Sequence, residues 1–140
     1  MAGELLLDTG ALVSLLDRSQ SHHQEFADFF ADWQGVVVST EAVLTESTHL
    51  LGRVRGGRQA CLDFFLSGGA TLVPSNEAAI ARCRDLIRKY DDLPMDYADA
   101  TLVVLADELE TNLVFTTDRR DFQVYRGVRN TSFQILPPEV

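Results

Sequence analysis

The sequence predicts an α/β fold, a three-layer α/β/α sandwich in which helices cover both faces of a central, mainly parallel sheet. Short, continuously apolar runs alternate with helical stretches along the chain. A strand that is apolar throughout is buried on both faces, which is typical of parallel sheets. The helical stretches between the runs supply the crossover connections that parallel neighbours require.

Five apolar runs predict the strands, because each is brief and bounded by turn-forming or polar residues. They are residues 5–7, 36–38, 71–73, 113–117 and 133–136. Apolar residues that recur three or four positions apart predict the helices. These are residues 11–16, 25–33, 42–51, 59–66, 77–90 and 97–109.

Capping residues support the boundaries of the last two helices. Asn76 precedes the helix formers from Glu77 onward, as an N-cap does. Asp96, followed three positions later by Asp99, resembles a capping box with Asp in place of Glu. Pro94 ends the element before it, because proline restricts the residue that precedes it.

Length and composition predict one globular domain over residues 1–140, with 46% apolar and 24% charged residues. No internal repeat or long linker divides the chain. No run approaches the roughly 18 apolar residues that a membrane helix needs. The apolar start is flanked by Glu4 and Asp8 rather than by basic residues. We therefore expect a cytoplasmic protein without membrane association.

The charge balance limits how nucleic acid can be bound. With 12 basic and 21 acidic residues, the formal net charge is −9, which argues against a protein that coats nucleic acid by bulk charge. Any phosphate partner must be held locally. Cys61 and Cys83 match no zinc or redox spacing, so we expect buried free thiols.

Acidic residues follow two of the predicted strands. Asp8 ends the first strand and Asp118 ends the fourth, at the carboxyl edge where open α/β sheets bind ligands. Glu46, in the helix after the second strand, and Asp99, in the first turn of a later helix, can face the same edge. Taken singly, each of these residues has an ordinary role as a cap, a turn residue or a solvated side chain.

Taken together, the four acids predict a metal site. Several carboxylates at one edge repel one another and are driven toward protonation unless a cation joins them. All the ligands are oxygen atoms, so Mg²⁺ or Mn²⁺ fits and Zn²⁺ does not. Metal-activated water can attack a phosphorus atom, which makes phosphodiester hydrolysis the expected reaction.

Four segments resemble the motifs of PIN-domain proteins of the VapC toxin type, in matching order and at matching intervals over nearly the whole chain. They read LLLDTGAL (5–12), VLTESTHLL (43–51), LPMDYADA (93–100) and FTTDRRDF (115–122). The resemblance implies a PIN-like fold, RNA cleavage with Mg²⁺ or Mn²⁺, a homodimer, and neutralisation by a small antitoxin protein.

The resemblance also implies roles for particular residues. The catalytic and metal-binding set is Asp8, Glu46, Asp99 and Asp118. Thr116 supplies a hydroxyl near this set, and Asp96 is either a supporting acid or the N-cap of its helix. Basic residues that follow two of the acids are candidates to contact RNA phosphates. These are Arg53, Arg55, Arg119 and Arg120.

Two alternative functions remain open. Asp8-Thr9-Gly10 also spells the signature of aspartic peptidases, but those enzymes are nearly all β and would leave the other three acids without a role. A PIN-like module that binds RNA or protein without cutting it is the other alternative. The presence of all four acids gives no reason to regard the site as inactive.

Overall fold

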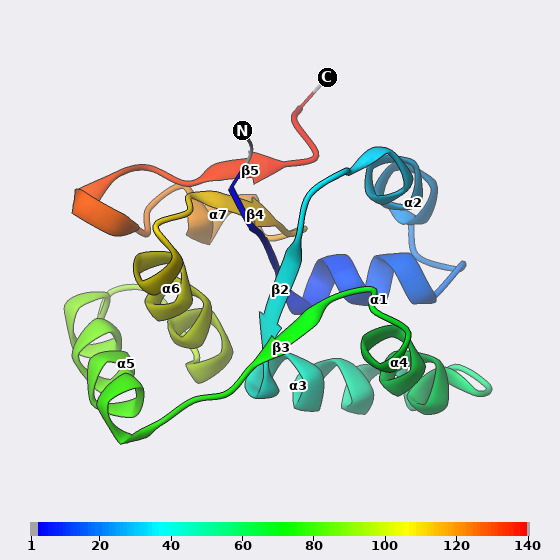
Figure 1. Cartoon of the computed structure of the whole chain (residues 1–140), viewed down its shortest axis with the longest axis horizontal. Helices are drawn as coiled ribbons and strands as arrows, with labels where there is room; N and C mark the ends of the chain where they lie inside the picture. Colours follow the sequence, from blue (N-terminus) through cyan, green and yellow to red (C-terminus); the bar gives the residue numbers. More distant parts are fainter. Residues whose placement is uncertain (1–2, 140) are drawn as a thin grey trace.

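Five parallel strands form the middle layer of the structure, a computed structural model that describes residues 3–139. The strands are β1 (Leu5–Leu7), β2 (Val37–Thr40), β3 (Thr71–Val73), β4 (Leu113–Phe115) and β5 (Gln134–Leu136). Their order in the sheet is β3-β2-β1-β4-β5, and each neighbouring pair is parallel (Figure 1). The predicted fold class is confirmed, and the mainly parallel sheet is parallel throughout.

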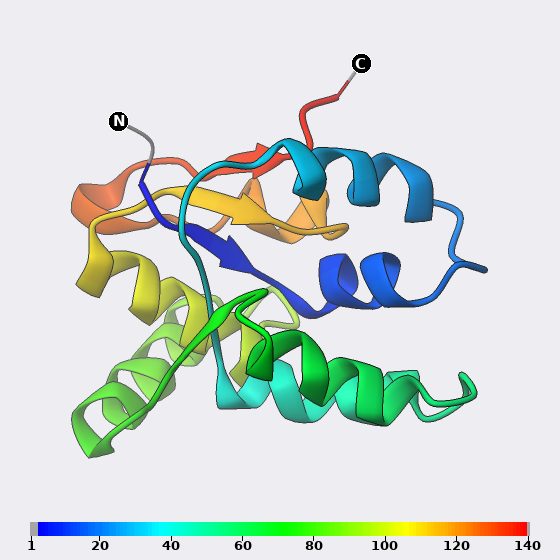
Figure 2. The same ribbon diagram turned by 45° about the vertical axis from the view of Figure 1, so that its right-hand side comes forward.

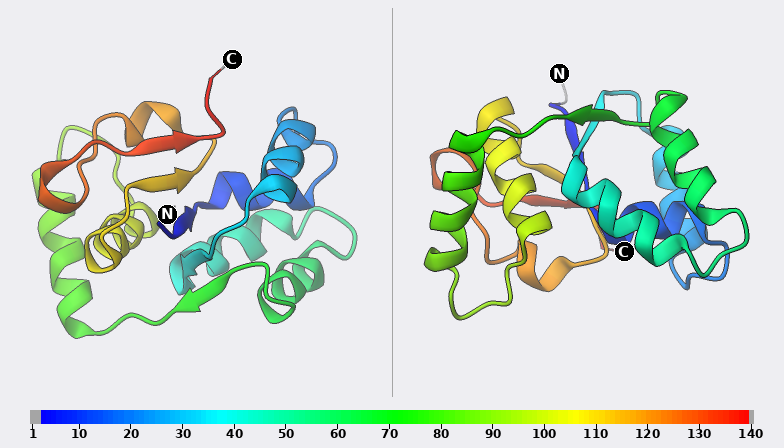
Figure 3. Two further views of the ribbon diagram at one scale, coloured as in Figure 1. Left: turned by 45° about the horizontal axis from the view of Figure 1, so that its top comes forward. Right: turned by 90° about the horizontal axis from the view of Figure 1, so that it is seen from below.

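Helices form the two outer layers. The helices are α1 (Thr9–Leu16), α2 (His23–Asp32), α3 (Glu41–Leu51), α4 (Gly57–Leu66), α5 (Glu77–Lys89), α6 (Tyr97–Leu109) and α7 (Arg119–Phe122), with a 3₁₀ turn at Val128–Asn130. Helices α5 and α6 cover one face of the sheet, while α1, α2 and α4 cover the other (Figures 2 and 3). Residues of α3 pack into both apolar clusters.

Strand β1 is buried from both sides, which explains its unbroken apolar sequence. Leu6 packs in the cluster beneath α5 and α6 together with Val114 of β4. Leu5 and Leu7 face the opposite way and pack with Phe115 in the cluster beneath α1, α2 and α4. All three leucines are fully buried. The central strand therefore fixes the position of the residue that follows it, which is Asp8.

Most boundaries agree with the prediction to within two residues, and one helix was missed. The strand predicted over residues 113–117 ends at Phe115, where the chain turns and then forms α7. Helix α7 has four residues and is N-capped by Asp118. A single turn is too short to show helical periodicity in a sequence. Cys61 and Cys83 are buried free thiols, as predicted.

No helix within residues 3–139 has both the length and the apolar character needed to cross a membrane.

The packing of β1 predicts a large loss of stability for Leu6→Ala. Deletion of a fully buried leucine side chain leaves a cavity, and we expect a cost of about 2–5 kcal/mol in the free energy of unfolding. Leu66→Ala is the matched control, because this α4 leucine is 83% exposed and its loss should change stability by less than about 0.5 kcal/mol. Denaturant melts measure both values, and equal losses would contradict the assigned core.

Candidate active site

The four acids predicted from the sequence all line one open pocket at the carboxyl edge of the sheet. Its volume is about 440 Å³. The acids are Asp8, Glu46, Asp99 and Asp118. They arrive from four separate segments: the end of β1, the middle of α3, the first turn of α6 and the turn after β4. Asp96 and Asp121 also line this pocket, which therefore contains six carboxyl groups.

Asp8 occupies the N-cap position of α1, but its side chain makes no capping hydrogen bond. Instead its Oδ2 accepts a hydrogen bond of 2.6 Å from Thr116 Oγ1, which in turn accepts one of 2.9 Å from the backbone N–H of Asp118. Burial raises the pKa of Asp8 to about 6, and the bond from Thr116 opposes this rise. Thr116, which the resemblance to PIN-domain proteins selects, therefore lies beside Asp8 and Asp118.

Asp99 and Asp96 have distinct positions at the start of α6. Asp96 is the N-cap, and its Oδ1 accepts a 2.8 Å hydrogen bond from the backbone N–H of Asp99. The carboxylate of Asp99 accepts a 3.0 Å bond from the hydroxyl of Tyr125. Burial, followed by the negative charges of Asp8 and Asp96, raises the pKa of Asp99 to about 8. Asp99 is thus a buried acid held by a fully buried tyrosine.

Asp121 belongs to the acidic cluster although the sequence analysis did not select it. Carboxylate oxygens of Asp99, Asp118 and Asp121 lie within 4.8 Å of one another. The backbone N–H of Asp121 donates a 3.3 Å bond to Asp118 Oδ1, which caps α7. Burial raises the pKa of Asp118. The spacing Asp118-x-x-Asp121 repeats that of Asp96-x-x-Asp99, and this repeat was the signal available in the sequence.

The triplet Asp8-Thr9-Gly10 has a structural explanation at each position. Thr9 Oγ1 donates a 2.6 Å hydrogen bond to Glu46 Oε1 and so ties α3 to the start of α1. A Cβ atom on Gly10 would lie 2.0 Å from Thr117 Oγ1, so glycine lets the start of α1 approach the turn after β4. The all-parallel sheet differs from the nearly all-β architecture of aspartic peptidases, and this alternative is wrong.

Of the four predicted phosphate contacts, only Arg53 lines the acidic pocket. Arg119 donates to Glu139 Oε1 at 3.0 Å and to the carbonyl of Pro137 at 2.8 Å, and it lines the neighbouring pocket. Arg55 and Arg120 are exposed.

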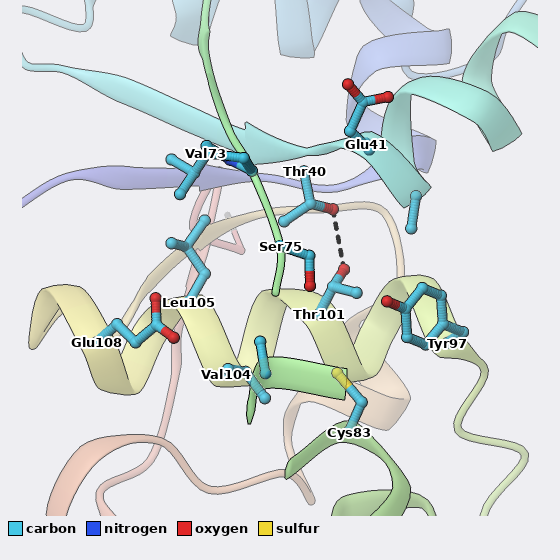
Figure 4. A pocket seen from close by; sticks show the side chains of 13 residues that line it. Thr40, Glu41, Val73, Ser75, Cys83, Tyr97, Thr101, Val104, Leu105 and Glu108 are labelled. Atoms are coloured by element: carbon cyan, nitrogen blue, oxygen red, sulfur yellow. Dashed lines mark hydrogen bonds between the residues drawn. The ribbon is translucent and has the colours of Figure 1, made fainter. Parts of the chain in front are cut away.

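A smaller hollow between β3, α5, α6 and the start of α3 has a different character (Figure 4). It measures about 70 Å³, and apolar side chains such as Val73 and Val104 form much of its wall. Thr40 and Thr101 share a 2.9 Å hydrogen bond there. Its two acids, Glu41 and Glu108, belong to no group of metal-ligating side chains within residues 3–139. The group of clustered carboxylates found within residues 3–139 therefore lies at the acidic pocket and not at this hollow.

Comparison with known proteins places the chain in a family. A profile of the PIN domain matches residues 5–128, and the chain belongs to the PIN domain family. Among individual proteins, it is similar to Ribonuclease VapC26 of Mycobacterium tuberculosis, with 29% identity over 135 residues, which is 95% of this chain and all of that protein.

Solved structures share the fold. The chain resembles VapC20 of M. tuberculosis, described as a sarcin-ricin loop cleaving toxin, with a TM-score of 0.76 and 19% identity over 83% of this chain and 91% of that one. It also resembles a toxin-antitoxin complex from Klebsiella pneumoniae, with a TM-score of 0.67 and 18% identity over 89% and 94% of the two chains. A third is VapBC2 of Rickettsia felis bound to promoter DNA, with a TM-score of 0.66 and 15% identity over 94% and 98%.

The raised pKa of Asp99 predicts that the metal-free protein loses stability as the pH rises. The folded state keeps a proton on Asp99 up to a pH of about 8, whereas an unfolded aspartate releases it near pH 4. Between these values folding takes up a proton, so stability falls with increasing pH until it levels off above pH 8.

Asp99→Asn should remove most of this dependence. In metal-free protein at pH 8 we expect the variant to exceed the parent by on the order of 3 kcal/mol, because asparagine can still accept the bond from Tyr125 and carries no charge. Thermal melts with a chelator from pH 5 to pH 9 measure the effect. Asp85→Asn, exposed on α5, is the control and should follow the parent curve. A variant less stable than the parent at pH 8 would make Asp99 a structural residue.

Proposed function

We propose that this protein is a metal-dependent ribonuclease of the VapC toxin type, which hydrolyses RNA phosphodiester bonds at the acidic pocket. The observation that carries the proposal is the convergence of six carboxyl groups in one pocket of a PIN domain. The similarity to a named ribonuclease over 95% of the chain supports the choice of RNA as substrate.

The ligand set fits a hard divalent cation. Carboxylate oxygens of three aspartates already lie within 4.8 Å of one another, and no histidine or cysteine belongs to this group. Mg²⁺ and Mn²⁺ prefer such oxygen ligands. Burial is the main cause of the raised pKa values of Asp8 and Asp99, with smaller contributions from neighbouring carboxylates. A bound cation would favour the ionised form of both carboxyl groups. The proposed metal-binding and catalytic residues are Asp8, Glu46, Asp99, Asp118 and Asp121.

When bound, a divalent cation would lower the pKa of a water molecule for attack on phosphorus and stabilise charge on the phosphoryl oxygens. The chain's own residues orient the acids for this purpose. Thr116 holds the carboxylate of Asp8, Tyr125 holds that of Asp99, and Thr9 holds that of Glu46. Each donor leaves other carboxylate lone pairs available, since a carboxylate has about four acceptor sites. Asp96 supports the site by capping α6.

The proposed partners are RNA and a small antitoxin protein. The likeness to toxin-antitoxin complexes from K. pneumoniae and R. felis supports the antitoxin. We further propose a homodimer, as implied by the resemblance of the motifs, and a cytoplasmic location, where RNA substrates are found. Arg55, Arg119 and Arg120 stay as candidates for phosphate contacts farther along the RNA.

Cleavage should depend on metal and on Asp8. We expect single-stranded RNA to be cut with Mg²⁺ or Mn²⁺, to remain intact in excess EDTA, and to be cut again when metal is restored. Asp8→Asn should lower the rate by about 100-fold or more, because it removes one charge from the centre. Gel assays with labelled RNA measure both effects, with Asp85→Asn as control. Equal cutting in EDTA would refute the metal mechanism, and RNA binding without cutting would favour a non-catalytic module.

Asp121 should contribute to metal binding. We expect Asp121→Asn to raise the Mn²⁺ concentration needed for half-maximal cleavage by about tenfold, since one of three clustered carboxylates becomes neutral. Calorimetric titration of the protein with Mn²⁺ gives a second readout without RNA. Asp63→Asn, exposed on α4, is the matched control. Unchanged Mn²⁺ affinity in Asp121→Asn would limit its role to the structure of α7.

A further inference from the structure

We propose that Arg53, held in place by the buried carboxylate of Asp17, contacts an RNA phosphate beside the bond that is cut. Asp17 is then a positioning residue that acts through Arg53. This inference rests on the proposed ribonuclease function and specifies how a negatively charged substrate is held at a negatively charged pocket.

The charges around the pocket make such a residue necessary. Six carboxyl groups line it, and Arg53 is the single arginine or lysine among its lining residues within the described part of the chain. The chain as a whole carries a net charge of −9, so no long-range attraction brings RNA to this edge. A phosphate that flanks the metal centre must therefore be held by a local cation.

Asp17 is built to hold a positive charge. It follows α1, is 4% exposed, and accepts hydrogen bonds of 3.0 and 2.7 Å from the backbone N–H and hydroxyl of Ser19. Its other oxygen accepts a 3.1 Å bond from Gln20 Nε2 and lies 3.5 Å from Arg53 Nη2. The bonds from Ser19 and Gln20, with the charge of Arg53, lower the pKa of Asp17 to about 2. Asp17 is therefore ionised at neutral pH.

The ion pair favours one position of Arg53 and leaves most of its guanidinium accessible. Arg53 lies in the exposed connection between α3 and α4, where a free arginine side chain would sample many rotamers. One terminal nitrogen faces Asp17, and the other N–H groups make no hydrogen bond within residues 3–139. The side chain is 62% exposed. It can therefore offer paired donors to a phosphate at a reduced entropic cost.

The same contacts place a second polar group at the rim. Gln20 lines the pocket, and its amide nitrogen is bound to Asp17. Asp17 thus organises two connections, the one between α1 and α2 and the one between α3 and α4, on one side of the acidic centre. If the ion pair between Arg53 and Asp17 only stabilised these two connections, its loss would lower the stability of the fold without changing the apparent affinity for RNA.

The test compares Arg53→Ala, Asp17→Asn and the double variant in saturation kinetics on single-stranded RNA with Mg²⁺. We expect Arg53→Ala to raise KM about tenfold with kcat changed less than about twofold. Asp17→Asn should raise KM about threefold, and the double variant should be no worse than Arg53→Ala alone, because Asp17 acts through Arg53. The salt dependence of log KM should decrease in slope by about 0.7 in Arg53→Ala, which corresponds to one lost phosphate contact.

Arg129→Ala is the matched control. Arg129 is also exposed and ion-paired, to Glu110 at 3.1 Å, but it precedes β5 at the opposite edge of the sheet, so KM should equal that of the parent. Thermal melts of all variants report whether they fold. If Asp17→Asn fails to fold, Arg53→Ala still tests the proposal, because the Arg53 side chain is exposed and its removal should leave the fold intact. An unchanged KM in Arg53→Ala would overturn the proposal. So would a double variant in which Asp17→Asn raises KM as much in the Arg53→Ala background as it does in the parent. Failure of the ribonuclease proposal is distinct, because the parent itself would leave RNA uncut.

Discussion

Burial of carboxyl groups at the carboxyl end of the sheet is the constraint on which the rest of this structure depends. Strand β1 is buried on both faces, so the residue that follows it, Asp8, is carried into the interior. Asp99 meets it there from α6, and burial raises the pKa of both carboxyl groups. Hydroxyl donors orient these acids but cannot neutralise them. The fold thus retains a destabilising arrangement that a bound cation would relieve, as is usual where function requires strain.

The hydrogen bonds that hold the acids join parts of the chain that are distant in sequence. Thr116 and Asp8 are 108 positions apart, Thr9 and Glu46 are 37 apart, and Tyr125 and Asp99 are 26 apart. Each of these bonds joins segments that only the tertiary fold brings together. Assembly of the site is therefore coupled to completion of the fold, and a change in a donor such as Tyr125 acts on the site through the carboxylate that it holds.

The features that could be predicted from the sequence are those encoded by local patterns of residues. The unbroken apolar run Leu5–Leu7 indicates a doubly buried strand, and its next residue marks the carboxyl edge, so the fold class and Asp8 were both accessible. Asp121 was missed because α7 is a single turn without periodicity. The position of Tyr125 is set by tertiary packing, which no local pattern encodes. Arg119 was selected as the neighbour of Asp118, but its guanidinium turns away to Glu139, since adjacency in sequence does not fix side-chain direction.

The acids and the rim of the pocket lie on different parts of this architecture. Most of the acids lie at strand ends and in the first turns of helices, where the sheet fixes them. The rim is formed by connections, which contribute Gln20 and Arg53. A connection can change in sequence without disturbing the sheet, whereas a change at β1 moves the acids themselves. In the function proposed here, the acids would supply the hydrolytic centre and the connections would contact the RNA, and Asp17 is the residue through which two of those connections meet.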